Sequence, residues 1–188
     1  MPLNIPNLVT CLRILLIPLI VGLFYLPDEW LSMGERNVAA TVAFVIAALT
    51  DWLDGYLARA LNQMSAFGAF LDPVADKLMI AASLIVLLQL GRVDAVVALI
   101  IIGREIAISA LREWMAQVGQ AKSVAVAFVG KVKTTMQMIA IPLLLFHDDL
   151  LEVIPCQWLG TILINVAAVL TVISMLYYLR RALPHASP

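Results

Sequence analysis

Four aspartates lie close together in a chain that is otherwise strongly apolar. Asp51, Asp54, Asp72 and Asp76 fall within one 26-residue segment, whereas 63% of all residues are hydrophobic. A carboxylate in or near the hydrocarbon of a bilayer is costly, and it persists mainly where it meets a cation or lines a wet cavity. The four together therefore predict a site that holds positive charge.

The spacing of this segment, D-x2-D-G-x2-A-R-x8-G-x3-D-x3-D, predicts two facing helices. The first two acids, with the Gly and Ala that follow, are separated by three, four and seven positions and so share one helix face. The later Gly and the last two acids form an i, i+4, i+8 row on the next helix. The motif residues are Asp51, Asp54, Gly55, Ala58, Arg59, Gly68, Asp72 and Asp76.

Four carboxylates brought together favour a divalent metal site. All-oxygen ligands suit Mg²⁺, Mn²⁺ or Ca²⁺, and without cations the acids would repel one another. Two ions about 3.5–4 Å apart would neutralise them, an arrangement common in phosphoryl chemistry. The small residues allow a nucleotide to approach, and Arg59 is able to pair with a phosphate oxygen. Taken singly, each residue could instead be a solvated acid or a helix-packing residue.

The composition predicts a single-domain, all-α integral membrane protein over residues 1–188. Only 13% of the residues are charged, against about 25% in soluble domains, and no basic run suggests nucleic acid. Six apolar segments are long enough to cross a bilayer, and their length without alternation argues against strands. They cover residues 7–27, 37–60, 69–90, 94–116, 124–146 and 156–180. The first is expected to be a retained helix rather than a signal peptide.

Basic residues near the predicted helix ends indicate the orientation. Nine of them fall on one side of the membrane, and only Arg36 and Arg92 fall on the other, which places both termini and the aspartates on the cytoplasmic side. The nine are Arg13, Arg59, Lys77, Arg112, Lys122, Lys131, Lys133, Arg180 and Arg181. Aromatic residues near helix ends, Trp30, Trp114, Trp158, Tyr177 and Tyr178, are expected in interfacial belts. Cys11 and Cys156 are expected near opposite faces, too far apart for a disulfide.

The motif is identified as the signature of the CDP-alcohol phosphotransferase family, and the chain fits it without departure. The resemblance extends over nearly the full length, through NIPNLVTCLRILLIP at the start and the later blocks GREIAISALREWMA and VAVAFVGKVKTTMQM. It implies six transmembrane helices, often in a homodimer, that exchange CMP on a CDP-linked lipid for an alcohol. The implied donor is CDP-diacylglycerol and the implied acceptor is sn-glycerol 3-phosphate, at the cytoplasmic face of a bacterial inner membrane.

The resemblance also implies roles for individual residues. Asp51, Asp54 and Asp72 would bind metal, and Asp76 would bind a second metal and act as general base; the ions would be Mg²⁺ or Mn²⁺. The residues implied to line the CMP side are Gly55, Ala58, Arg59 and Gly68, with Asn7 and Thr50 as weaker candidates.

Cations in the second half of the chain form a candidate site for the acceptor phosphate. Arg104 and Arg112 are eight residues apart and share one broad helix face, and Lys131 and Lys133 stand at the cytoplasmic part of the next predicted helix. A dianionic phosphate needs such partners. Two alternatives stay open: the three cations other than Arg104 could be positive-inside anchors, and Arg104 could pair with a neighbouring acid, Glu105 or Glu113.

Other functions are compatible with parts of the pattern. A sibling enzyme could use serine, inositol phosphate or phosphatidylglycerol as acceptor, because the signature does not specify it. A divalent-cation transporter would also contain intramembrane carboxylates, but these would be spread along a pore through both leaflets. A purely structural membrane protein would leave the four acids without a role.

Overall fold

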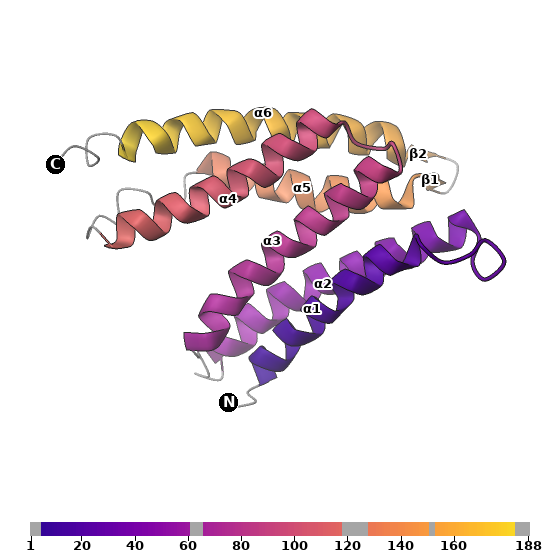
Figure 1. Cartoon of the computed structure of the whole chain (residues 1–188), viewed down its shortest axis with the longest axis horizontal. Coiled ribbons are helices and arrows are strands. Elements are labelled where there is room, and N and C mark those ends of the chain that lie inside the picture. The colour runs from indigo at the N-terminus through magenta and orange to yellow at the C-terminus, as the bar shows by residue number, and fades with distance from the viewer. Residues whose placement is uncertain (1–4, 61–65, 118–127, 151–152, 183–188) are drawn as a thin grey trace.

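The computed structural model describes the backbone of residues 5–60, 66–117, 128–150 and 153–182; within these ranges the side chains of 5–9, 51–60, 66–67, 69, 128–129, 131 and 181–182 are not described. The described chain forms helices and one short strand pair (Figure 1). The elements are α1 (Ile5–Leu23), α2 (Met33–Ala60), α3 (Ala66–Gln89), α4 (Ala95–Gln117), α5 (Phe128–Phe146), β1 (Asp149–Leu150), β2 (Ile154–Pro155) and α6 (Cys156–Ala182).

Each of the six predicted segments coincides with one helix, and the all-α prediction is confirmed in outline. The largest shifts are at the first connection. α1 ends at Leu23, before the predicted residue 27, because the amide of Tyr25 already donates to the carbonyl of Gly22 in a tight turn, at 3.0 Å. α2 starts at Met33 rather than at residue 37.

A capping box explains the early start of α2. The hydroxyl and the backbone amide of Ser32 donate to the Glu35 carboxylate at 2.7 and 2.8 Å, so both residues satisfy groups at the open end of the helix. The same two hydrogen bonds hold the pKa of Glu35 below its usual value. The local sequence Ser-x-x-Glu therefore adds a turn that apolar periodicity alone does not predict.

The expectation of no strands is wrong for one short loop. β1 and β2 pair antiparallel, with Asp149 opposite Pro155 and Leu150 opposite Ile154. α5 ends at Phe146, and the next residue, His147, has a φ of 68° in the left-handed region, which directs the chain from the helix toward β1. The pair is too short to leave any alternating pattern in the sequence.

The helices form two groups. α1 packs on α2 and α3, α4 packs on α6 and α3, and α5 packs on α6 and α2. In Figure 1, α1 and α2 lie on one side and α4 and α6 on the other, with α3 running obliquely between them. The two groups approach each other at the end that holds β1 and β2, and they diverge toward the end where α1 begins and α6 ends.

Close packing holds α5 against α6. A Cβ on Gly160 would lie 2.7 Å from Cγ of Leu144, so only glycine lets the helices approach this closely. Leu144 belongs to the main buried cluster, which also contains Phe44, Leu87 and Ile101. With Ile20 and Ile164 in the same cluster, one core joins residues from all six helices.

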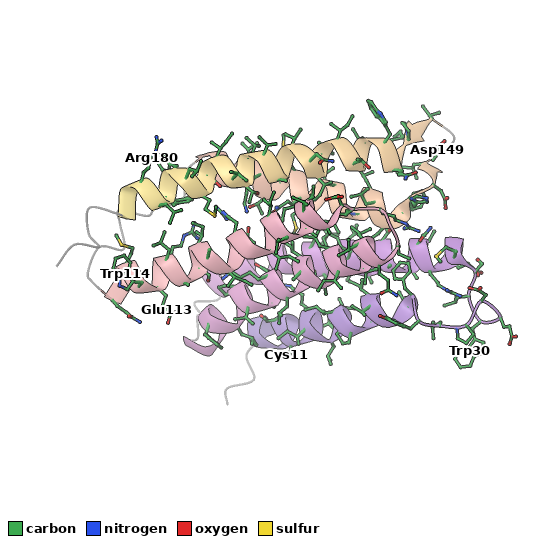
Figure 2. The ribbon with its side chains drawn as sticks, turned by 45° about the horizontal axis from the view of Figure 1, so that its top comes forward. Cys11, Trp30, Glu113, Trp114, Asp149 and Arg180 are labelled. Carbon is green, nitrogen blue, oxygen red and sulfur yellow. The ribbon has the colours of Figure 1, made fainter. Side chains whose placement is uncertain are left out.

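Much of the outer surface is apolar. Leu15, Leu99 and Val169 are 68%, 71% and 60% exposed, and a surface of this kind is typical of contact with lipid or a partner. Among the described residues, one helix stretch, Cys156–Arg180, is long and apolar enough to cross a membrane by length and composition, with a mean hydropathy of 2.3. Figure 2 shows Trp114 and Arg180 at one end of the bundle and Trp30 and Asp149 at the other.

The two arginines at the end that holds β1 and β2 have structural partners. Arg36 pairs with Asp28 and donates to the carbonyl of Leu31 at 2.9 Å. Arg92 donates to the carbonyls of Leu144 and Leu145 at 3.1 and 2.8 Å. It also donates to the Asn37 side chain at 2.8 Å. Arg92 therefore caps α5 and ties it to α2, which explains a basic residue on the side predicted to be poor in them.

Candidate functional site

The acidic motif lies on α2 and α3, as the spacing predicts. Asp51 and Asp54 belong to the last turns of α2, and Asp72 and Asp76 belong to the first turns of α3. The side chains of Asp51, Asp54, Gly55, Ala58 and Arg59 lie outside the described residues, so the predicted meeting of the two acidic faces is untested and remains a prediction.

The remaining residues of the predicted CMP side are only partly described. Gly68 is buried in the first turn of α3. The hydroxyl of Thr50 donates to the carbonyl of Ala47 at 2.8 Å, so part of its hydrogen-bonding capacity is used within α2. Asn7 lies on α1, but its side chain is outside the described residues. Their roles remain predictions.

α1 holds the two aspartates of α3 in place. The Thr10 hydroxyl donates to Oδ1 of Asp72 at 2.6 Å, and Nη1 of Arg13 donates to Oδ1 of Asp76 at 2.9 Å. The Arg13 side chain is fully buried, whereas that of Asp76 is 41% exposed. Asp76 is therefore held by a buried cation while part of its side chain is exposed.

Sequence reasoning missed both of these partners. Arg13 entered only the count of basic residues, and Thr10 was not singled out. A signal exists in retrospect: Thr10 and Arg13 are three residues apart, and Asp72 and Asp76 are four apart, so each pair spans one helical turn. Because α1 packs on α3, the two residues of the α1 pair are each able to contact one aspartate of the α3 pair.

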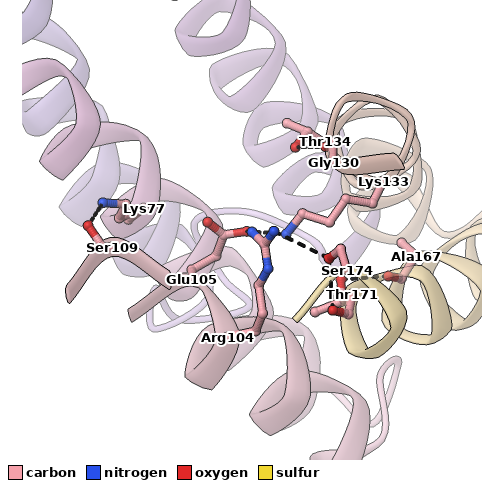
Figure 3. A network of polar contacts seen from close by, with 10 residues as sticks. All are labelled: Lys77, Arg104, Glu105, Ser109, Gly130, Lys133, Thr134, Ala167, Thr171 and Ser174. Atoms are coloured by element: carbon pink, nitrogen blue, oxygen red, sulfur yellow. Dashed lines mark hydrogen bonds and ion pairs between the residues drawn. The ribbon is translucent and has the colours of Figure 1, made fainter. Parts of the chain in front are cut away.

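The predicted acceptor cations Arg104 and Lys133 meet at one carboxylate. Oε1 of Glu105 contacts Nη1 of Arg104 at 3.2 Å and also pairs with Nζ of Lys133 (Figure 3). Nη2 of Arg104 donates to Oγ of Ser174 at 3.3 Å. Arg104 and Lys133 are 6% and 1% exposed, so neither is a surface anchor. The alternative in which Arg104 pairs with Glu105 is confirmed; the side chain of Lys131 lies outside the described residues.

Tyr178 joins the two arginines of α4. The guanidinium carbons of Arg104 and Arg112 lie 5.7 and 5.6 Å from the centre of its ring, within the range of cation–π attraction. Arg112 is exposed, whereas Tyr178 is fully buried. The prediction that Tyr178 belongs to an interfacial belt is wrong, because its side chain is buried in a cluster with Ile108 and Met115 of α4. Tyr177, its neighbour, is 42% exposed as expected.

One contact links the acidic motif to the cations. Lys77, the residue after Asp76, donates to the hydroxyl of Ser109 on α4 (Figure 3). Lys77 and Glu105 also line the same small cavity of about 110 Å³ between α3 and α4. Lys77 therefore joins α3, next to Asp76, to the helix that carries Arg104 and Arg112. We call the carboxylates of α3, Lys77 and the cations of α4 and α5 the polar layer.

The donor set fits a hard divalent cation. Among the side chains that are described, no three of His, Cys, Asp or Glu are grouped closely enough to hold a metal, but the side chains of the two acids of α2 are not among them. Asp72 and Asp76 follow each other by one turn of α3 and present only oxygen atoms, which suits Mg²⁺ or Mn²⁺. A site completed by Asp51 and Asp54 is compatible with what is described.

Comparison with known proteins gives a consistent result. The sequence profile of the CDP-alcohol phosphatidyltransferase family matches residues 3–173. A CDP-diacylglycerol–glycerol-3-phosphate 3-phosphatidyltransferase from Salmonella choleraesuis is 48% identical over 184 residues, 97% of this chain and 96% of the relative. Proteins of the same description from Shigella flexneri and Escherichia coli K12 match with the same identity and coverage.

Proposed function

The chain belongs to the CDP-alcohol phosphatidyltransferase family, and we propose that it transfers the phosphatidyl group of CDP-diacylglycerol to sn-glycerol 3-phosphate. The products are phosphatidylglycerophosphate and CMP. The observation that carries this assignment is the 48% identity, over nearly the whole of both chains, to relatives described by this activity. The polar layer supports it, because it contains both carboxylates for a diphosphate–metal complex and cations for a phosphate.

The reaction needs a base and a means to neutralise the leaving group. The acceptor hydroxyl attacks the phosphorus next to the diacylglycerol, the bond from this phosphorus to the bridging oxygen breaks, and CMP leaves with that oxygen. Asp76 takes the hydroxyl proton, and its exposed side and its fixed contact with Arg13 support this role. Asp51, Asp54, Asp72 and Asp76 hold two Mg²⁺ or Mn²⁺ ions, which supply positive charge to the diphosphate when bound.

The cations of α4 and α5 bind the phosphate of the acceptor. Arg104, Arg112 and Lys133 belong to one connected group, through Glu105 and Tyr178, and Lys131 is assigned to the same group by its place in the sequence. Arginine and lysine donors form charge-assisted hydrogen bonds with phosphate oxygens. CMP is bound on the opposite side, by Gly55, Ala58, Arg59 and Gly68, with Asn7 and Thr50 nearby.

The enzyme is a six-span protein of the bacterial cytoplasmic membrane, with both termini and the polar layer on the cytoplasmic side, and it acts as a homodimer. The exposed apolar side chains of the helices support immersion in lipid. The structural roles of Arg36 and Arg92 support the orientation, because they account for the two basic residues on the other side. A hydrophilic acceptor then reaches the layer from the cytoplasm and the donor from the inner leaflet.

A transfer assay with one acceptor at a time tests the proposal. Purified protein in detergent receives CDP-diacylglycerol, Mg²⁺ and radiolabelled glycerol 3-phosphate, serine, inositol phosphate or phosphatidylglycerol. We expect a lipid product from glycerol 3-phosphate alone, abolished by EDTA and by Asp76→Asn. Asp149→Asn, on exposed β1, serves as the matched control and should retain activity.

The other outcomes separate the alternatives. Transfer to serine or another alcohol would keep the family and replace the acceptor. Folded protein that transfers to no acceptor, but carries divalent cations into vesicles, would favour the transporter.

A further inference from the structure

Gln137 of α5 is a buried amide that the described chain leaves without a partner. Its side chain is 0% exposed, and neither Oε1 nor Nε2 has a hydrogen-bond partner among the described residues. Buried amides normally satisfy both their acceptor and their donors, because an unpaired polar group in the interior is costly. Gln137 therefore indicates a place where a ligand supplies the missing hydrogen bonds.

Gln137 lies one helical turn from Lys133. The two residues are four positions apart on α5 and both are buried, so they share the inner face of the helix. Long side chains on a helix lean toward its N-terminal end, which brings the Gln137 amide back over the turn that carries Lys133. Lys133 pairs with Glu105, which also contacts Arg104 (Figure 3). The amide thus borders the cations to which the acceptor phosphate is assigned.

The proposed base lies at about the same depth as these cations. Asp76 and Lys133 are each 13 residues before the last residue of their helix, α3 and α5. The ends of these two helices are joined through Arg92. At about 1.5 Å per residue, both side chains start about 20 Å from this end of the bundle. Gln137, one turn nearer to that end, therefore lies on the β1–β2 side of a line from the phosphate site to Asp76.

An acceptor that spans this line has one hydroxyl between its two ends. The phosphate of glycerol 3-phosphate contacts the cations, and its terminal hydroxyl, the less hindered nucleophile, is directed at Asp76. The hydroxyl on the central carbon is both a donor and an acceptor, so it is able to bind either Oε1 or Nε2 of an amide. Arg104 and Lys133 are 6% and 1% exposed, so a ligand that reaches them enters the same closed layer as Gln137.

We propose that Gln137 is a specificity-determining residue that binds the central hydroxyl of the acceptor, and that it thereby selects glycerol 3-phosphate over phosphate esters that lack this hydroxyl. The inference rests on the proposed function, in which the cations bind the acceptor phosphate and Asp76 takes the proton. A buried partner for a substrate hydroxyl discriminates against an analogue without it more strongly than pocket shape does. The amide is neutral, so it adds this selectivity without opposing the charge of the phosphate.

The acceptor 3-hydroxypropyl phosphate tests the proposal, because it keeps the phosphate and the terminal hydroxyl and lacks only the central one. The kcat/KM of each acceptor is measured with CDP-diacylglycerol and Mg²⁺, on the full chain in detergent. For the wild type we expect a preference for glycerol 3-phosphate of about 30-fold, on the scale of one or two buried hydrogen bonds. Gln137→Met has an unbranched side chain of similar length and should reduce the preference to about threefold or less. The loss should fall on glycerol 3-phosphate, with little change for the analogue.

Thermal unfolding separates this role from a structural one. Because the amide has no partner within the described chain, Gln137→Met should leave the Tm of the protein without acceptor unchanged or raise it. An amide needed for the fold would instead lower the Tm on substitution and reduce transfer to both acceptors equally. Gln157→Met, at an exposed position in the first turn of α6, is the matched control and should keep the wild-type preference.

A second variant keeps the test decisive if Gln137→Met does not fold. Gln137→Asn retains the amide but withdraws it by one methylene, and it should show a preference below that of the wild type. Three results would overturn the inference: a wild type without preference, a wild-type preference in the folded Gln137 variants, and equal losses for both acceptors with a lowered Tm. Transfer without preference leaves the proposed function in place, whereas absence of transfer to glycerol 3-phosphate overturns the proposed function and the inference with it.

Discussion

The two helix groups hold their charges in opposite ways. In the first group, α1–α3, each described aspartate of the motif has its own partner on α1: Thr10 for Asp72 and Arg13 for Asp76. In the second group, α4–α6, one carboxylate, Glu105, serves two cations. We call the group α1–α3 the acidic half and the group α4–α6 the basic half.

The difference indicates what each half lacks. Asp76 remains 41% exposed although it is paired, so the acidic half keeps a partly exposed carboxylate, as the proposed metal site requires. In the basic half, two buried cations, Arg104 and Lys133, share the single carboxylate of Glu105. The excess positive charge is costly unless a further anion compensates for it. One half is therefore prepared for cations and the other for an anion, as a reaction between a diphosphate and a phosphate ester requires.

The largest effect is expected in the acidic half. Asp72→Asn should lower kcat by about 10³-fold or more, on the scale of removing one group that stabilises charge in the transition state. The residual activity should need more Mg²⁺ for half-maximal rate, whereas the KM for glycerol 3-phosphate should change little. Steady-state kinetics with varied Mg²⁺ measure both. An unchanged metal requirement would contradict the division between the halves.

In the basic half, Arg112→Ala should raise the KM for glycerol 3-phosphate by about 100-fold. A hydrogen bond to a charged group contributes about 1.5–3 kcal/mol, and 1.4 kcal/mol corresponds to a factor of ten. The KM for CDP-diacylglycerol should change far less. Varying each substrate at saturation of the other separates the two values, and equal effects on both would exclude an acceptor role for Arg112.

Tyr178→Leu should raise the same KM by about tenfold, because the ring orients Arg104 and Arg112 and a partly desolvated cation–π contact contributes about 1–2 kcal/mol. The adjacent, exposed Tyr177 provides the comparison: Tyr177→Leu has the same composition as Tyr178→Leu and removes only the edge-on contact with the Tyr178 ring, at 5.8 Å between ring centres, so its effect on the KM should be much smaller. A tenfold effect from both variants would indicate damage to α6 rather than to the arginines.

The smallest effect concerns the contact between α1 and α3. Thr10→Val removes one hydrogen bond to Asp72 and should lower kcat/KM by about fivefold, since one hydrogen bond contributes about 1 kcal/mol. Thr10→Ser, which keeps the hydroxyl, should be close to wild type. The kinetic comparison of these two variants isolates the hydroxyl, and a similar loss in Thr10→Ser, which lacks only the methyl group, would show that the effect is not specific to the hydrogen bond.

Local periodicity predicted what lies along one helix and missed what lies between helices. The i, i+4 row of Asp72 and Asp76 and the shared face of Arg104 and Arg112 follow from 3.6 residues per turn. The pairing of Arg13 with Asp76 depends on how α1 and α3 are rotated toward each other, which no single-helix pattern specifies.

The same limit explains two misread residues. Lys133, for which an anchoring role stayed open beside the acceptor site, is buried against Glu105, and Tyr178 counted as interfacial but is enclosed. Counting rules treat a residue near a helix end as exposed to the interface, whereas its burial depends on which neighbour faces it. The prediction about Arg104 allowed for Glu105 because these two residues are adjacent in the sequence.

The contacts of Arg92 have a consequence for biogenesis. Arg92 joins Asn37 of α2 to the carbonyls of Leu144 and Leu145 at the end of α5. These partners are more than 100 residues apart, so the ribosome has to complete five helices before this contact can form. Until then the contact through Arg92 between α2 and α5 is missing. A chain truncated before residue 144 should therefore remain a target for membrane proteases.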